Sequence, residues 1–203
     1  MKYQDLVIKG GKFIGEFEKM YKKFEDPWGQ TTKENVENSI SRQVVCNYIK
    51  HFQINTIVQF GCGLGRTTNF IYENTGIDIL GVDISETSIK KSKMKYPKLK
   101  FSVNDIENIY EYKQYECFYF SKITWYILEN NKIDKIFESM KNLFKEKYFI
   151  HNLVFNKGNL KYGLDYFSTL DQFIEFCPFT LLGKSSTKLD QNCGTETSAI
   201  FKI

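Results

Sequence analysis

The stretch VQFGCGLGRTTNF, at residues 58–70, most constrains the fold. An apolar run ends at Phe60, glycines stand at positions 61, 63 and 65, and a segment with helical character follows. Glycine lacks a Cβ and tolerates positive φ, so such a turn lets the backbone approach a ligand closely. The pattern predicts a strand, a tight turn and a helix, with a ligand at the turn. A dinucleotide, a phosphate and a sulfonium nucleoside all remain open as that ligand.

From residue 55 onward, short apolar runs alternate with helical patterns. We expect strands at 55–60, 77–83, 99–105, 115–120 and 147–155, and helices at 65–76, 85–97, 122–129, 132–145 and 169–177. The chain ends differently, because the apolar runs at 179–186 and 196–203 are joined by a short polar loop without a helix. This order predicts an α/β fold: a doubly wound, Rossmann-like, mostly parallel seven-stranded sheet that ends in an antiparallel hairpin.

Two helical patterns precede the first strand, at 13–24 and at about 33–52, and Pro27 and Gly29 interrupt the chain between them. We therefore expect an N-terminal helical cap over residues 1–52 and one compact α/β domain over residues 53–203. Ser85 is the expected N-cap of the helix at 85–97, and Gly76 is expected to close the helix before it.

Composition excludes several classes of protein. The chain is 42% hydrophobic and 16% aromatic, as expected of an ordered globule, and its net charge is only +4. Arg42 and Arg66 are its only arginines, which argues against nucleic-acid binding. The five cysteines are widely separated without a CxxC spacing and there are two histidines, so no metal site is expected. With no membrane-spanning run and no apolar leader at its start, the sequence predicts a cytoplasmic protein.

Two carboxylates stand near the ends of the second and third expected strands. Asp83 closes ILGVD and Asp105 closes FSVND. In an open α/β sheet, ligands bind at the carboxyl ends of the strands. There Asp83 can accept hydrogen bonds from ribose hydroxyls and Asp105 from the exocyclic amine of adenine, although Asp105 can equally be a helix cap. The glycine turn and the two carboxylates together favour an adenosine-containing ligand.

The glycine spacing separates the candidate ligands. A dinucleotide site has the pattern GxGxxG and a P-loop needs Gly-Lys-Ser/Thr, whereas this chain has GxGxG followed by Arg66. Over residues 25–203 the sequence resembles class I S-adenosylmethionine-dependent methyltransferases: VQFGCGLGR is similar to the first motif, ILGVDIS to the second, FSVNDIEN to the third and YECFYFSKITWYIL to the fourth. The resemblance implies S-adenosyl-L-methionine as cofactor and S-adenosyl-L-homocysteine as product. It implies cofactor-binding roles for Gln59, Gly61, Gly63, Gly65, Arg66, Asp83, Ile84, Asp105, Ile106 and Ser121.

Within that family, DPWG at 26–29 and SKITWYIL at 121–128 are similar to small-molecule methyltransferases of the nodulation N-methyltransferase type. That likeness implies methyl transfer to oxygen or nitrogen of a small polar metabolite, with a sugar, sugar nucleotide or surface-glycan precursor favoured. The acceptor pocket is expected to include Trp28, Trp125, Tyr162 and Tyr166. His151 and Tyr126 are the candidate catalytic residues, with a structural histidine and a core tyrosine as the alternatives.

Two positions depart from the family pattern. Gln59 stands where an acidic residue is usual, and Lys122 stands where we would expect a glutamate. The first removes a charge from the site of the cofactor's amine, and the second leaves no carboxylate base there. They keep a non-catalytic cofactor-binding partner subunit open as an alternative. A nicotinamide-dependent oxidoreductase is the other alternative. The oligomeric state is left open.

Overall fold

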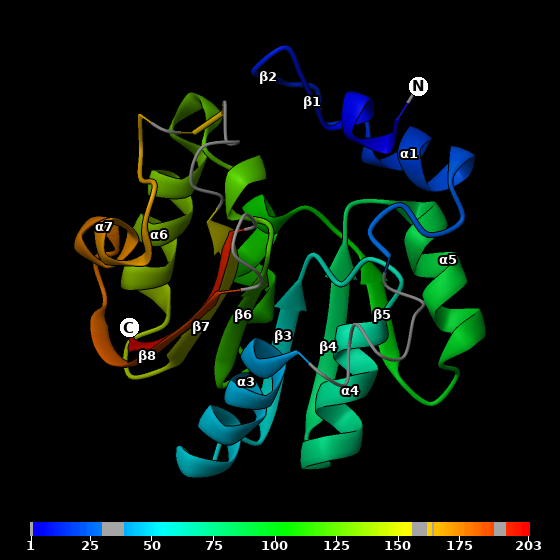
Figure 1. The fold of residues 1–203 in the computed structure, drawn as a ribbon. Coiled ribbons are helices and arrows are strands. Elements are labelled where there is room, and N and C mark those ends of the chain that lie inside the picture. The colour runs from blue at the N-terminus through cyan, green and yellow to red at the C-terminus, as the bar shows by residue number, and fades with distance from the viewer. Residues whose placement is uncertain (1, 30–38, 156–161, 164, 189–193) are drawn as a thin grey trace.

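The computed structural model describes residues 2–29, 39–155, 162–163, 165–188 and 194–203. At its centre is a seven-stranded sheet with the order β5-β4-β3-β6-β7-β9-β8 (Figure 1). The first five of these strands run parallel, and β9 is antiparallel to both β7 and β8. This confirms the predicted sheet and its terminal hairpin. The strand bounds, in chain order, are β3 Thr56–Phe60, β4 Asp78–Asp83, β5 Lys100–Val103, β6 Cys117–Ser121, β7 Tyr148–Phe155, β8 Thr180–Lys188 and β9 Thr195–Lys202.

Helices cover both faces of the sheet because successive side chains of a strand point to opposite faces. In β3, Ile57 packs in the cluster formed with α3 (Ile40–His51) and α4 (Arg66–Thr75). Its neighbour Val58 packs in the larger cluster formed with η2 (Ile106–Tyr112), α6 (Lys132–Leu143) and α7 (Leu170–Phe176). The helix α5 (Glu86–Lys95) packs beside β5 and β4. The strands of the core are therefore buried on both sides.

Local signals fix the ends of these helices. Ser39, Ser85 and Thr169 precede α3, α5 and α7, and each side-chain oxygen accepts a hydrogen bond from a backbone N–H of the first turn. Gly76 has left-handed φ and closes α4, as the sequence predicts. The expectations for Ser85 and Gly76 are confirmed.

Two expected helices are different in the structure. Instead of a helix at 13–24, the chain forms η1 (Tyr3–Leu6), a small hairpin of β1 (Ile8–Lys9) and β2 (Lys12–Phe13), and then α1 (Phe17–Lys23). Gly10 and Gly11, both with positive φ, turn the hairpin, and Phe13 pairs with Ile8. At 122–129 the chain forms only the short turns η3 (Thr124–Tyr126) and η4 (Glu129–Asn131). The backbone leaves helical geometry at Ile127 (φ −125°, ψ 21°), and the positive φ of Lys122 and Asn130 bounds the segment on either side.

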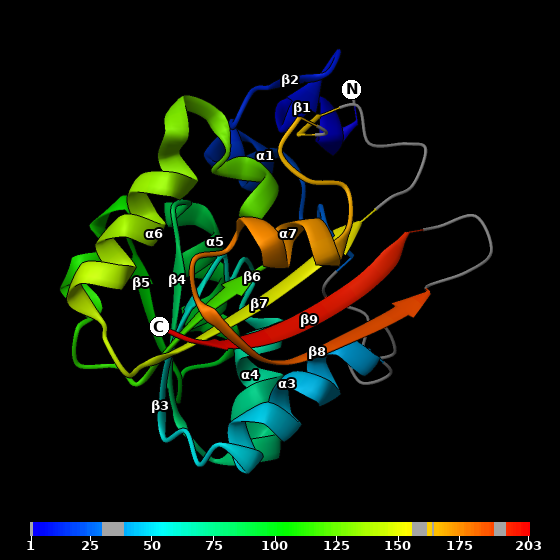
Figure 2. The ribbon, with the colours of Figure 1, turned by 90° about the vertical axis from the view of Figure 1, so that its left-hand side faces the viewer.

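The expected cap is smaller than residues 1–52. The segment at 2–29, called here the N-terminal segment, lies above the carboxyl ends of the parallel strands (Figures 1 and 2). By contrast, α3 packs on a face of the sheet, with Val45 and Ile49 in the same cluster as Ile57. Its apolar stripe serves the sheet core and not the cap. The part of the expected second helix at 33–38 lies outside the described residues.

The described cysteines Cys46, Cys62, Cys117 and Cys177 are free thiols, and all are buried. Burial raises the pKa of Cys46 to about 11 and that of Cys177 to about 12, so these thiols stay protonated at neutral pH. Among the residues that the structure describes, no helix has the length and apolar character needed to span a membrane. Within the same residues, no group of three or more His, Cys, Asp or Glu side chains could hold a metal ion.

Candidate active site

A cavity of about 640 Å³ lies at the carboxyl ends of the parallel strands. It falls within the range of about 300–1,000 Å³ that is usual for small-molecule sites. One wall comes from the ends of β3, β4 and β6 and the turn after β5. Another comes from seven residues of the N-terminal segment, namely Tyr3, Ile8, Phe13, Gly15, Phe17, Tyr21 and Trp28.

The cavity brings together most of the residues expected from the sequence. Those that line it are Gly61, Asp83, Ile84, Asp105, Ile106, Ser121, Trp28, Trp125, Tyr126 and Tyr162. Those that do not line it are Gln59, Gly63, Gly65, Arg66, His151 and Tyr166. The second group belongs to the glycine loop, to its neighbours away from the cavity, or to other parts of the fold.

The glycine loop is a left-handed turn that packs tightly against its neighbours. Gly61, Gly63 and Gly65 have φ of 75°, 53° and 74°. A Cβ on Gly61 would lie 2.0 Å from Cγ2 of Ile123, and one on Gly65 would lie 2.7 Å from the ring of Phe101. The first contact holds the loop against the end of β6, and the second holds it against β5. Only glycine satisfies both the backbone angle and the space at these positions.

Asp83 ends β4 and binds the glycine loop. Its Oδ2 accepts from the N–H of Gly63 at 2.9 Å, and its Oδ1 accepts from the N–H of Ser85 at 3.0 Å. Burial raises the pKa of Asp83, and these backbone donors oppose that rise by favouring the carboxylate. Each oxygen keeps a lone pair that a ligand's hydroxyl could use, so the carboxylate is a preformed acceptor on the cavity wall.

Asp105 lies beyond the end of β5, which stops at Val103, and it caps η2. Its Oδ1 accepts from the N–H of Glu107 at 3.0 Å and from Nζ of Lys132 at 2.9 Å. Its Oδ2 accepts no hydrogen bond within the described residues, so it is available to a donor. Lys132, the first residue of α6, also lines the cavity and was not expected from the sequence.

Gln59 and Arg66 lie away from the cavity. Gln59 is fully buried, and its Oε1 accepts from the Thr68 hydroxyl at 2.8 Å. Arg66 reaches the Tyr96 hydroxyl at 3.5 Å. Their side chains therefore stabilise the helix behind the loop.

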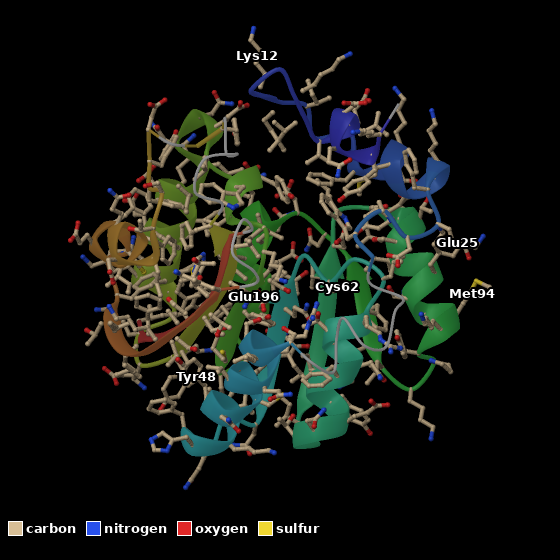
Figure 3. All side chains as sticks on the ribbon, viewed as in Figure 1. Lys12, Glu25, Tyr48, Cys62, Met94 and Glu196 are labelled. Carbon is tan, nitrogen blue, oxygen red and sulfur yellow. The ribbon has the colours of Figure 1, made fainter. Side chains whose placement is uncertain are left out.

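The β6 side of the cavity holds two cations: Arg42, which the sequence did not single out for this site, and Lys122, the second departure from the family pattern. Nε of Arg42 donates to Thr67 at 2.9 Å, and Nζ of Lys122 pairs with Oε1 of Glu196 at 2.5 Å. Glu196, labelled in Figure 3, lies on β9 and is 6% exposed, and its Oε2 accepts from the hydroxyl of Ser39, the N-cap of α3, at 3.2 Å. Burial lowers the pKa of Lys122. Burial would raise the pKa of Glu196, but the charge of Lys122 outweighs it and the pKa is lowered.

Aromatic rings form another part of the cavity wall. Tyr126 meets Phe17 edge-on at 5.1 Å between centroids, stacks on Phe13 at 6.0 Å and lies 6.2 Å from Trp28. Phe13 also stacks on Tyr162 at 6.1 Å. These five rings, named here the aromatic wall, join the N-terminal segment to Tyr126 in the turn after β6 and to Tyr162, which follows β7. The hydroxyl oxygen of Tyr162 is buried without a hydrogen-bond partner among the described residues.

His151 lies in the middle of β7, and its side chain is 0% exposed. Its ring stacks on Phe173 at 3.7 Å, and Nε2 lies 2.8 Å from the Thr124 hydroxyl. Burial lowers the pKa of His151 to about 3, so the imidazole is neutral. This placement supports the structural alternative for His151. Tyr166 lies outside the cavity and donates to the Leu128 carbonyl at 2.7 Å.

A comparison with protein families agrees with this geometry. Residues 57–147 match a family model described as a methyltransferase domain. No curated protein matches the sequence significantly. The matched residues run from β3 to the residue before β7 and include the glycine loop, Asp83 and Asp105, so this part of the chain is similar to methyltransferase domains.

Solved structures share the fold at low sequence identity. The PH0226 protein of Pyrococcus horikoshii superimposes with a TM-score of 0.68 at 16% identity, covering 92% of this chain and 99% of that chain. The N-methyltransferase NodS from Bradyrhizobium japonicum, in complex with S-adenosyl-L-homocysteine, gives 0.66 at 9% identity over 88% and 92%. A S-adenosylmethionine-dependent methyltransferase from Clostridium acetobutylicum gives 0.63 at 14% identity over 90% and 98%.

Proposed function

We propose that the protein transfers a methyl group from S-adenosyl-L-methionine to an oxygen or nitrogen of a small polar metabolite. A sugar, sugar nucleotide or surface-glycan precursor is the favoured acceptor. One observation carries the proposal: a single cavity joins a glycine loop and two carboxylates suited to adenosine with a wall of aromatic rings suited to a second molecule.

The described residues fit the cofactor. Asp83 is assigned to the ribose hydroxyls and the free Oδ2 of Asp105 to the adenine amine, because both carboxylates line the cavity with acceptor capacity left. Ile84 and Ile106 supply apolar surface for the base. Gly61 lets the loop approach the ligand, while Gln59, Gly63, Gly65 and Arg66 are assigned to the shape of that loop.

The methionyl carboxylate is assigned to the β6 side of the cavity. Arg42 and Lys122 both line it there, whereas their counter-charge Glu196 does not. An anion is therefore favoured at this point by the local charge. Ser121, the last residue of β6, also lines the cavity and is assigned to the same ligand.

The acceptor is assigned to the aromatic wall. Flat rings such as Trp28, Tyr126 and Tyr162 can stack on the apolar face of a sugar, and their polar atoms can bind its hydroxyls. Trp125 is assigned to support, because its indole N–H is already donated to the Val154 carbonyl at 3.1 Å. Tyr166 is assigned to the turn that carries Leu128.

The cofactor supplies an electrophilic methyl group when bound. The chain's own task is to orient the two ligands and to exclude water, and this task is assigned to the partly buried rings of the aromatic wall. Burial raises the pKa of Tyr126 far above neutrality, so it stays a neutral phenol that orients the acceptor by hydrogen bonding. His151 receives no part in proton transfer. The free cysteines agree with a reducing, cytoplasmic location.

Calorimetric titration tests the proposal. S-Adenosylhomocysteine, S-adenosylmethionine and NAD are titrated into the wild type, Asp83→Ala and the control Asp78→Ala. Asp78 lies at the opposite end of β4, where it pairs with exposed Lys100. We expect both sulfur nucleosides to bind the wild type and Asp78→Ala, and binding to be lost in Asp83→Ala.

Binding of NAD alone would make the protein an oxidoreductase. Where the sulfur nucleosides bind, sugar phosphates and sugar nucleotides are screened as acceptors by release of S-adenosylhomocysteine. Cofactor binding with no turnover on any oxygen or nitrogen acceptor would favour the partner-subunit alternative.

A further inference from the structure

The N-terminal segment is tied to α5 by two charged side chains, one from each partner. Glu18 of α1 reaches the first turn of α5, and Lys91 of α5 reaches the last turn of α1 and the residue after it. The two elements also lie side by side in Figure 1. We name this pair of contacts the clamp.

Glu18 makes the more extensive of the two contacts. Its carboxylate accepts from the Ser85 hydroxyl at 2.6 Å, the Thr87 hydroxyl at 2.7 Å and the Thr87 N–H at 3.1 Å. Burial opposes ionisation, but these hydrogen bonds outweigh it and lower the pKa of Glu18 to about 2. A charge-assisted acceptor at a helix N-terminus is stronger than a neutral one.

Lys91 makes the reciprocal contact. Its Nζ donates to the Tyr21 carbonyl at 2.8 Å and to the Phe24 carbonyl at 3.3 Å. Phe24 is the C-cap residue directly after α1, so its carbonyl has no partner within that helix. In the clamp, the negative charge of Glu18 meets an N–H group at the start of α5, and the positive charge of Lys91 meets the carbonyl groups at the end of α1.

The clamp connects the part of the cavity at Asp83 with the aromatic wall. On one side, Ser85 is the partner of Glu18, and the N–H of Ser85 also orients the Asp83 carboxylate. On the other side, the segment that Glu18 anchors carries Phe13 and Phe17 of the aromatic wall. A displacement of α1 would thus move both the wall and a hydrogen-bonded neighbour of Asp83.

We propose that Glu18 and Lys91 are positioning residues that hold the aromatic wall in register with the cofactor-binding turn at Asp83–Ser85. Cofactor binding and docking of the N-terminal segment then favour each other, and by linkage the effect is reciprocal. This inference rests on the proposed function, since it takes an adenosine-type ligand at Asp83 and an acceptor at the rings.

Hydrogen exchange of the backbone amides in residues 3–24 tests the clamp. It is measured with and without saturating S-adenosylhomocysteine on Glu18→Gln and Lys91→Met. The controls Glu25→Gln and Lys90→Met remove the same charges from exposed side chains of the same two elements (Glu25 is labelled in Figure 3). Lys91→Arg keeps the donors and serves as the conservative variant.

We expect the ligand to slow exchange of residues 3–24 in the wild type. In Glu18→Gln and Lys91→Met, exchange should be faster by about fivefold and should no longer respond to the ligand, which still binds at Asp83. The two controls should resemble the wild type, and Lys91→Arg should restore most of the response.

The outcomes separate the two ideas. The clamp is overturned if residues 3–24 exchange equally fast in Glu18→Gln and Glu25→Gln. It is also overturned if the ligand slows exchange in Glu18→Gln and Lys91→Met as much as in the wild type. Either result leaves the methyltransferase proposal intact. Failure of S-adenosylhomocysteine to bind the wild type overturns the proposed function, whatever the exchange rates of the variants.

Discussion

The substitution Gly61→Ala measures how much the close approach of the glycine loop to β6 contributes. Gly61 has φ of 75°, and an added Cβ would lie 2.0 Å from Cγ2 of Ile123 and 3.2 Å from the Ser121 carbonyl oxygen. A left-handed backbone costs an alanine about 1–2 kcal/mol. Forcing a methyl group into filled space costs about 1–3 kcal/mol more. We therefore expect a loss of about 2–5 kcal/mol in the free energy of unfolding.

Gly76→Ala is the matched control. Gly76 has nearly the same φ, 71°, but an added Cβ there meets no heavy atom within 4 Å. It should cost only the backbone term of about 1–2 kcal/mol. Both variants are compared with the wild type by urea denaturation. The difference between them isolates the steric term.

A double-mutant cycle checks the assignment to Ile123. Ile123→Ala removes Cγ2, so Gly61→Ala should cost less in that background than in the wild type. Equal losses for Gly61→Ala and Gly76→Ala, or no interaction energy in the cycle, would refute the reasoning. The loop would then tolerate a side chain, and its glycines would need another explanation.

Three further predictions concern ionisable groups. Burial lowers the pKa of His151 from 6.5 in the unfolded chain to about 3 in the fold. The neutral imidazole therefore stabilises the fold fully above pH 6.5, and this contribution to the free energy of unfolding is lost as the pH falls from 6.5 toward 3. Urea denaturation at about pH 7 and about pH 5 should show the free energy of unfolding falling by at most about 1.4 kcal/mol per pH unit in the wild type. The variant His151→Asn should not show this fall. Glu196→Gln should destabilise the protein by about 1–2 kcal/mol, less than for a fully buried pair because Lys122 is partly exposed, and urea denaturation measures it. Lys132→Met should weaken the binding of S-adenosylhomocysteine, measured by calorimetry, about tenfold, because Asp105 is then free to rotate. Binding of S-inosylhomocysteine, a 6-oxo analogue that lacks the adenine amine, should stay nearly unchanged.

The sequence was sufficient where a residue's position follows from local pattern and strand order. Asp83 closes a strand next to the one that ends at the glycine loop, and parallel strands present their carboxyl ends at one edge. Their meeting therefore follows from the alternation of strands and helices. Asp105 was predicted for the same edge, although it caps a 3₁₀ helix there instead of ending a strand.

The sequence was insufficient where distant segments meet. Nothing local to Phe13 reveals that it stacks on Tyr126 and Tyr162, because docking of the N-terminal segment decides that contact. The two glycines after Lys9 were a hairpin signal that the helical spacing of the following aromatics concealed. The full burial of His151 was hidden for a related reason: β7 is buried on both faces, so its residues show no alternation of apolar and polar side chains.

Lys122 illustrates how tertiary structure changes the interpretation of a departure from a family pattern. From the sequence, a lysine in place of the expected glutamate means only that a carboxylate is missing. In the fold, the ammonium group pairs with Glu196, which follows it by 74 residues and reaches the same place because β9 runs antiparallel to β7 beside β6. A carboxylate is thus present near the end of β6, supplied by another strand and neutralised by the lysine. Because a glutamate at position 122 would face Glu196 with the same charge, the two positions are coupled, and Lys122→Glu should be tolerated far better with Glu196→Lys than alone.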